Sequence, residues 1–336
     1  MTKSLSVVMP FYNEADHLPA TIDALAEAVS RSSFSAELVL VDDGSSDGSA
    51  DVARRAASGR LPVEVVRGSR DGRFKARRAG VDAAKSETAL LLDARVRLHA
   101  DSLRFLADAL SPDAAVWNGH VIPQLEGNPF GAFGNVLVHL AWSAYFADPR
   151  PVSFGLENFD HFPKGTGCFV APRTLLLKAM ESFDARVSDW RLVSDDTQLI
   201  RWIAARHSIH LSPEFGCDYQ PRTSLRTFVA NAFYRGSTFL DGHGRRESRF
   251  FPLVVGFFPL SAGIALLILR RPLSAPILVA ATAGLAGAVA ARARRPAFET
   301  LSFAALGPVY AVAHGAGMWR GLGALAREQL RRASAS

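Results

Sequence analysis

The chain has 336 residues, which is enough for one large domain and an appended segment. It is 49% hydrophobic and its mean hydropathy is +0.10, a high value for a protein dissolved in water. The net charge of +6 suits an anionic partner, such as a membrane surface or nucleotide phosphates. We predict no nucleic-acid partner, because the sequence has no recognition motif and no basic-aromatic array. Cys168 and Cys217 lack metal-binding spacing, and we expect both to be reduced packing residues.

Two apolar runs near the N-terminus predict strands that end at polar or acidic residues. Residues 5–10 form the first run, and Pro10 is expected to end it because proline cannot donate a ladder hydrogen bond. Residues 38–41 form the second run, which stops at Asp42 and Asp43. Open α/β sheets bind ligands at the carboxyl ends of their strands, so the sequence predicts a site at this edge.

The turn after the second strand has strong local signals. Gly44 permits a tight turn, and the Ser/Asp cluster over residues 45–49 is expected to supply the N-caps of a helix over 50–57. Such turns are common, so the alternative is a well-capped strand-to-helix connection with incidental acids. A helix over 16–30 is also predicted, because its apolar residues recur at helical spacing.

Residues 7–14 read Val-Val-Met-Pro-Phe-Tyr-Asn-Glu, and residues 41–48 read Val-Asp-Asp-Gly-Ser-Ser-Asp-Gly. In these two motifs the chain resembles the family 2 glycosyltransferases, which have the GT-A fold, a Rossmann-like α/β domain that binds nucleotide sugars. The resemblance extends more loosely to about Leu211. It implies that the donor nucleoside is bound by Pro10, Tyr12, Glu14 and Asp43, with the aspartate facing the base.

The resemblance also places the donor diphosphate beside a basic helix. Residues 73–80 open a helix that is expected to run to about residue 85, where the family usually has Ala-Arg-Asn-x-Gly. Lys75 and Arg77 are the basic residues that would lie near the phosphates. The alternative is a solvated basic helix face.

A strand over 88–92 ends in Asp93-Ala94-Arg95, where the family has an Asp-x-Asp that grips a divalent metal. Arg95 replaces the second acid, and an arginine cannot coordinate Mg²⁺ or Mn²⁺. Asp93 is therefore the single candidate metal ligand of this motif. Two explanations stay open. Arg95 supplies phosphate-binding charge in place of the metal, or it pairs with Asp93 or Asp43 and the site is inactive.

A second acidic centre opens the amphipathic helix that begins at Asp195-Asp196. The family has Glu-Asp at this place and uses the second acid as the general base, which implies that role for Asp196 with Asp195 beside it. The alternative is that both acids only cap the helix. Trp190 is predicted either to stack on a sugar or to pack.

The segment between the two centres has weaker signals. Residues 165–167 are small and precede a strand, which lets the backbone approach a bound sugar closely. Residues 123–164 lie where family members form acceptor regions, and a helix is expected over 136–146.

The C-terminal third is apolar with arginine-rich breaks. Residues 222–236 predict a basic amphipathic helix at a membrane surface. Three stretches, 250–269, 273–291 and 301–319, each reach the length of about 20 residues that crosses a hydrocarbon core. Two crossings would keep the basic C-terminus in the cytoplasm, whereas three would put it outside, so the count stays open.

We therefore expect four parts: a GT-A glycosyltransferase domain (1–221), an interfacial segment (222–249), two or three membrane helices (250–320) and a basic tail (321–336). The predicted function is inverting transfer of a sugar from a nucleoside-diphosphate sugar to a membrane-associated, lipid-linked acceptor. The alternative is an inactive nucleotide-sugar-binding or scaffold protein of the membrane. The N-terminus has no signal peptide, so the expected location is the inner or plasma membrane with the catalytic domain in the cytoplasm.

Overall fold

The computed structural model describes residues 3–185, 187–193, 195–244, 246, 248 and 250–335, with only the backbone of Asp195 and Ala335. The chain divides into two compact units. The first, called here the sheet unit, comprises Met1–Gln124, Ala144–Asp184 and Asp195–Gln220. The second, called the helical unit, comprises Leu125–Ser143, Ala185–Ser194 and Pro221–Ser336.

The sheet unit is built on one mixed sheet. In the described part of the chain, nine strands form it in the order β3-β2-β1-β4-β8-β6-β9-β5, and β7 pairs with β9. β3, β2, β1 and β4 run parallel to one another, whereas β8 runs antiparallel to β4. The strands are β1 (Lys3–Phe11), β2 (Phe34–Asp42), β3 (Val63–Arg67), β4 (Thr88–Leu92), β5 (Val96–Leu98), β6 (Trp117–Pro123), β7 (Val152–Phe154), β8 (Cys168–Pro172) and β9 (Ile209–Tyr219).

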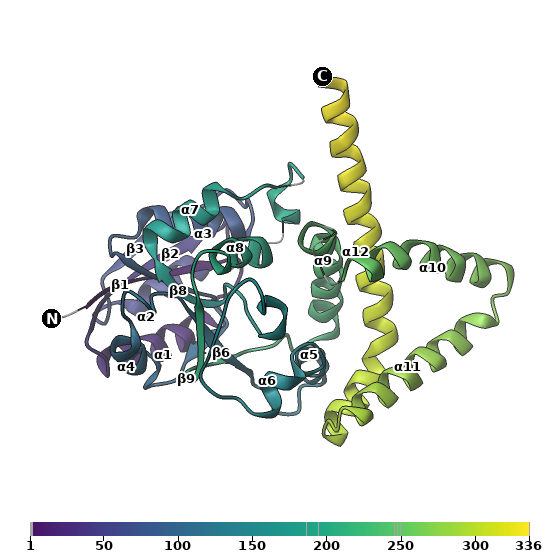
Figure 1. The fold of residues 1–336 in the computed structure, drawn as a ribbon, viewed down its shortest axis with the longest axis horizontal. Helices are drawn as coiled ribbons and strands as arrows, with labels where there is room; N and C mark the ends of the chain where they lie inside the picture. Colours follow the sequence, from purple (N-terminus) through teal and green to yellow (C-terminus); the bar gives the residue numbers. More distant parts are fainter. Residues whose placement is uncertain are drawn as a thin grey trace. The chain divides into compact units, whose positions relative to one another are not determined.

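Helices cover both faces of this sheet, which is why its central strands are apolar on both sides. Val7 and Met9 of β1 join the core cluster that also contains Leu18 of α1, whereas Val8 faces Gly80 of α3. α1 packs against α2 and α4, and α3 packs against α7, which in turn packs against α8 (Figure 1). These helices are α1 (Leu18–Ser30), α2 (Ser49–Ala57), α3 (Arg73–Ala83), α4 (Ser102–Ala109), α6 (Ser143–Ala147), α7 (Arg173–Glu181) and α8 (Asp195–Ala204), with a 3-10 turn η1 (Phe159–His161).

β1 continues one residue beyond the predicted end at Pro10. Phe11 pairs with Asp42 of β2, and its carbonyl accepts a hydrogen bond from the backbone of Asp43. Successive residues of a strand direct their backbone groups to opposite neighbours, so Pro10 turns its missing N–H toward β4. The β4 ladder has already ended at Val8, so the proline removes no bond.

The Ser/Asp cluster holds the start of α2, although not through the N-cap residue itself. Gly48 precedes the helix in a left-handed conformation and has no side chain, while Asp47 accepts a hydrogen bond of 3.0 Å from the backbone amide of Ser49, the first residue of α2. The cluster also joins two loops: Asp47 accepts from the backbone of Ala15, and Ser45 accepts from the backbone of Asn13. Short polar side chains compete for nearby backbone donors in this way. The loops after β1 and β2 are thereby bound to each other.

The helix predicted over 136–146 is in fact two helices. α5 (Pro129–Ala141) starts earlier because Asn128 accepts hydrogen bonds from two backbone amides of the first turn. It ends at Trp142, whose backbone is no longer helical, and α6 follows.

The helical unit is assembled around aromatic and small residues. Its core cluster comprises Phe133 and Val136 of α5, Phe228 of α9, Ala290 of α11 and Phe303 of α12. The unit contains α5, α9 (Leu225–His243), α10 (Phe251–Arg270), α11 (Ser274–Arg292), α12 (Ala297–Ala335) and the 3-10 turn η2 (Trp190–Leu192).

Three of these helices, α10, α11 and α12, are long and apolar enough to cross a membrane. Only 6% of the apolar window of α10 or α11 is buried, against 33% for α12. Exposed apolar surface on this scale is costly in water and suits contact with lipid. The third predicted stretch, 301–319, is the middle of α12, whose 39 residues make it about 58 Å long at 1.5 Å per residue.

We expect the full chain to stay in the membrane fraction after a carbonate wash, because α10 and α11 have little protein around them. Leu260 and Leu285 are 65% and 68% exposed near the middle of these helices. Changing both to lysine should release the chain from the pellet, since a lysine at the bilayer centre costs about 2.5–3.5 kcal/mol.

Leu156→Lys is the matched control, because Leu156 is an exposed apolar residue of the sheet unit. It should leave the membrane fraction unchanged. Recovery of the unaltered chain as a detergent-free soluble monomer would show that these helices do not anchor it.

Candidate active site

The candidate site lies at one edge of the sheet, where four strand ends meet. β2, β1 and β4 are adjacent and parallel, so their carboxyl ends share that edge. β8 is antiparallel to β4 and pairs Cys168 with Leu92, so the segment before β8 reaches the same edge. The strand order therefore brings Asp43, Glu14, Asp93 and Thr166 to the same edge of the sheet.

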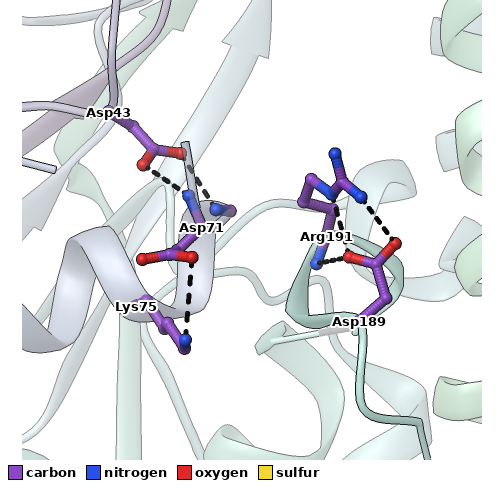
Figure 2. A network of polar contacts seen from close by, with 6 residues as sticks. Asp43, Asp71, Lys75, Asp189 and Arg191 are labelled. Carbon is purple, nitrogen blue, oxygen red and sulfur yellow. Dashed lines mark hydrogen bonds and ion pairs between the residues drawn. The ribbon is translucent and has the colours of Figure 1, made fainter. Parts of the chain in front are cut away.

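Asp43 holds the loop that leads into α3. Its two carboxylate oxygens accept hydrogen bonds of 3.0 Å from the backbone amides of Asp71 and Gly72, as Figure 2 shows. The backbone amide of Gly68 donates to Asp42 at 2.7 Å, which fixes the start of the same loop. Asp43 is buried, so its charge is satisfied by backbone dipoles. Its predicted contact with a nucleobase stays a prediction.

Two cation contacts lie beside this loop. The guanidinium of Arg70 lies over the ring of Tyr12, 4.9 Å from its centre. Lys75 pairs with Asp71 at 3.7 Å, and both side chains are well exposed (Figure 2). An exposed pair of this kind contributes little stability.

Arg95 pairs with neither of the acids that the sequence suggested. Its Nε donates to Glu14, with 2.8 Å and 3.0 Å to the two carboxylate oxygens. The side chains are 14% and 10% exposed, so the ion pair is largely shielded from water. The ion pair with Glu14 restricts where the Arg95 side chain lies, and the predicted pairing of Arg95 with Asp93 or Asp43 is wrong.

Arg77 bridges two carboxylates that are far apart in the sequence. Its Nη2 is 2.6 Å from Oδ1 of Asp93, and its Nη1 is 3.7 Å from Oδ1 of Asp196. Only 2% of the Arg77 side chain is exposed. The strand-end acid and the helix-start acid therefore meet at one buried guanidinium.

Asp196 is positioned by a second group. The Thr166 hydroxyl and backbone amide both donate to its carboxylate. Burial raises the pKa of Asp196, but the charge of Arg77, the Thr166 hydrogen bonds and the charge of Arg73 outweigh it, so the pKa is lowered overall. Its side chain is still 43% exposed, so an ionised carboxylate here can reach a proton on an incoming group.

The described donor set does not fit a protein-held metal ion. Within the described residues, no three His, Cys, Asp or Glu side chains gather closely enough to hold one. One oxygen of Asp93 is engaged by Arg77, and the position of the second acid is Arg95. The other oxygen of Asp93 lies against Gly167, where an added Cβ would come within 3.2 Å. A divalent ion prefers several oxygen ligands, and the side chains described at this edge do not form such a set.

The remaining predicted residues fall into different parts of the structure. Pro10 lies within β1, and Asp195 begins α8 with its side chain outside the described part of the chain. Trp190 opens η2 in the helical unit, so its contact with a sugar stays a prediction. Asp189 caps that turn and pairs with the Arg191 guanidinium (Figure 2), and this hydrogen bond lowers the pKa of the aspartate.

Sequence reasoning missed the roles of Thr166 and of the loop over 68–72. Residues 165–167 drew attention only for their small size, although a hydroxyl between two glycines is a ready donor. The loop had no apolar signal, and only the pairing of β2 with β3 brings it to Asp43.

The fold and this edge define the class of protein: a GT-A domain that presents acids at the carboxyl ends of parallel strands. Residues 6–137 match the family described as Glycosyl transferase family 2. This part of the chain is therefore similar to family 2 glycosyltransferase domains.

Two curated relatives show where the similarity lies. The undecaprenyl-phosphate 4-deoxy-4-formamido-L-arabinose transferase of Aeromonas hydrophila subsp. hydrophila is 36% identical over 109 residues, which are 32% of this chain and 33% of that protein. The enzyme of the same name from Serratia proteamaculans is 37% identical over 94 residues, 27% of this chain and 29% of that protein. The chain thus matches about a third of the length of these relatives.

A solved structure supports the fold over most of the chain. The mannosyltransferase PcManGT from Pyrobaculum calidifontis, in complex with GDP-Man and Mn²⁺, aligns with a TM-score of 0.54 at 18% identity. The alignment covers 94% of this chain and 86% of that one. At this identity the likeness is one of fold.

We expect Asp43→Ala to lower the thermal unfolding temperature of the purified chain, because it frees the loop over 68–72. Losing a hydrogen bond to a charged group costs about 1.5–3 kcal/mol. Asp71→Ala is the matched control, since it removes only an exposed ion pair with Lys75. Equal melting temperatures for the two variants, measured by differential scanning fluorimetry in detergent, would contradict this role.

Proposed function

We propose that the chain is an inverting glycosyltransferase that moves a sugar from a nucleoside-diphosphate sugar to a lipid-linked acceptor at a membrane. The observation that carries the proposal is the convergence of Asp93, which lies in the segment that matches family 2, and Asp196, which follows that segment, on Arg77. The two acids are 103 positions apart in the sequence (196 − 93), so their meeting reflects a built site rather than a local turn.

The chemistry needs one base and a positive charge beside the leaving group. Asp196 is half-exposed and its lowered pKa keeps it ionised at neutral pH, so it would remove the proton of the acceptor hydroxyl or phosphate as that oxygen attacks the anomeric carbon. Attack from the side opposite the diphosphate inverts that carbon. Arg95 would donate to the departing diphosphate, oriented by Glu14.

The donor would lie along the ends of β1 and β2. The exposed ring of Tyr12 and the guanidinium of Arg70 offer flat faces to a nucleobase, and Asp43 holds the loop beside them. Lys75 is exposed next to that loop and supplies a mobile charge for phosphate.

The membrane helices support the acceptor class, and so do the relatives, which are undecaprenyl-phosphate 4-deoxy-4-formamido-L-arabinose transferases. We propose a polyprenyl phosphate as the acceptor and the inner or plasma membrane as the location, with the sheet unit in the cytoplasm where nucleotide sugars are made. Arginines follow α10 and α11 and continue through the end of α12, which suits anionic lipid headgroups.

The test has two stages. A panel of nucleoside-diphosphate sugars is first screened for thermal stabilisation of the detergent-solubilised chain. Stabilising donors are then incubated with undecaprenyl phosphate, and the glycolipid is resolved by mass spectrometry. Donor binding without transfer to any polyprenyl phosphate would favour the alternative, a nucleotide-sugar-binding protein without catalysis.

Asp196→Asn should lower the transfer rate by roughly 10²-fold or more, in line with the contribution of general-base catalysis. The amide keeps the size of the side chain and can still accept from Thr166, so donor affinity should change little. The measurement is a pair of single-turnover rates and donor dissociation constants. Asp82→Asn is the matched control, since Asp82 only pairs with Arg78 on the surface. A near-normal rate for Asp196→Asn would move the role to another group.

Transfer should survive EDTA, because the described site lacks a ligand set for a metal and Arg95 supplies the charge instead. The assay compares rates with EDTA and with added Mg²⁺ or Mn²⁺. Complete loss of transfer in EDTA, restored by either metal, would contradict the proposed role of Arg95.

Arg95→Ala should lose about one to two decades of transfer rate, the equivalent of one charge-assisted hydrogen bond. Arg95→Lys should recover only part of the lost rate, since the point charge of an ammonium does not reproduce the paired N–H donors of a guanidinium. The double variant Glu14→Gln/Arg95→Ala is the stability control, because it avoids leaving the shielded Glu14 charge unpaired.

A further inference from the structure

Arg77 is the most deeply buried charged side chain of the candidate site, and its burial bears on its role. Its α3 helix is pressed against the sheet at Gly80, where an added Cβ would come within 2.3 Å of Val8 and 2.8 Å of Val41. Because Gly80 has no side chain, α3 lies close against β1 and β2, and this close packing brings the guanidinium of Arg77 to a buried position near the strand ends. The resemblance suggested a phosphate contact, but a side chain that is 2% exposed has little surface to offer a donor.

The contacts of Arg77 instead run between two acids. Nη2 lies 2.6 Å from Asp93 and Nη1 lies 3.7 Å from Asp196. A guanidinium is planar and rigid, so holding one carboxylate on each terminal nitrogen fixes the two acids relative to each other. Asp93 is itself held through its backbone, which donates to Gly167 at 2.8 Å.

The groups around Asp196 can be named from each neighbouring element. α3 contributes the charges of Arg77 and Arg73, and the segment before β8 contributes the hydroxyl and amide of Thr166. The end of β4 contributes Asp93 through Arg77.

α7 packs against α8, but its charged groups are engaged elsewhere or exposed. Arg173 donates to the carbonyls of Val81 and Asp82, and Glu181 pairs with Arg78. Arg77 is therefore the cation in ion-pair range of Asp196 among the described residues of these elements.

We propose that Arg77 is a positioning residue that ties Asp196 to Asp93, so that the base is fixed in place and kept ionised by a charge that the substrate never touches. This inference rests on the proposed function, in which Asp196 is the base. It assigns Arg77 to the acceptor half of the reaction instead of the donor phosphates, and it makes the Asp93 carboxylate a structural anchor.

The experiment separates positioning from phosphate binding. Arg77→Lys keeps the charge but loses the rigid fork, so kcat should fall by about tenfold or more while the dissociation constant of the nucleoside diphosphate changes by less than about twofold. Arg77→Gln removes the charge as well. The carboxylate of Asp196 then loses its nearest cation, its pKa rises, and the acidic limb of kcat moves to higher pH.

The direction of the pH effect follows from the direction in which the pKa of Asp196 moves. Asp196 works as the ionised form, so activity is present above its pKa and is lost as the pH falls through it. Thr166→Val offers a second route, because it removes the hydroxyl donor and leaves Arg77 in place. It should also move the acidic limb upward, and it keeps the inference testable if Arg77→Gln fails to fold.

Arg78→Gln is the matched control. Arg78 is the next residue of α3, and it pairs with Asp82 at 2.9 Å on the surface. It should change neither kcat nor the pH profile. Nucleoside-diphosphate affinity that falls tenfold in Arg77→Lys with an unmoved acidic limb would overturn the proposal in favour of a phosphate ligand. Unchanged kinetics in Arg77→Lys would overturn it as well.

A double-mutant cycle tests the same link without turnover. Arg77→Gln should destabilise the detergent-solubilised chain less in an Asp196→Asn background than alone, because that background no longer holds a charge that needs the guanidinium. Additive effects on thermal unfolding would overturn the link. Coupling in a chain that transfers no sugar to any acceptor would uphold the link while refuting the proposed function.

Discussion

The candidate site depends on one constraint, that a buried charge must be paired. Arg77 is buried because α3 lies tightly against β1 and β2 at Gly80, and a guanidinium in that position requires carboxylates around it. Asp93 and Asp196, which are distant in the sequence, meet the requirement together. The same pairing that satisfies the arginine therefore sets the distance between two acids at the edge where a donor and an acceptor would meet.

The loops at this edge are ordered by hydrogen bonds from side chains to backbone. Asp43 holds the amides that lead into α3, and Asp47 joins the β2 loop to the β1 loop. Loops carry backbone groups that no ladder satisfies, so acidic side chains are a natural means of fixing them. These acids thus hold the loops of the site in place through protein contacts alone.

The strands and their ends were predictable because buried parallel strands are continuous apolar runs, and Asp43, Glu14 and Asp93 follow such runs directly. The pairings were not. Which acid Arg95 meets depends on how far β1 extends past Pro10, and which acids Arg77 meets depends on how closely α3 approaches the sheet. Both sets of ion pairs depend on packing between segments that are distant in sequence, and the local sequence pattern does not predict that packing.

The Asp-Ala-Arg motif can be understood from charge. Replacing a carboxylate by a guanidinium adds two positive charges to the edge, which is the charge that a divalent cation would bring to a diphosphate. A metal also imposes geometry, and in the proposed site the ion pair with Glu14 would restrict where the Arg95 guanidinium lies. A fixed guanidinium binds phosphate oxygens through directed hydrogen bonds and needs no ligand set from the protein. In the proposed reaction Asp93 would not be needed as a metal ligand, which is consistent with its ion pair with Arg77 at 2.6 Å. Arg95 would then hold the leaving group, and Arg77 would hold the base.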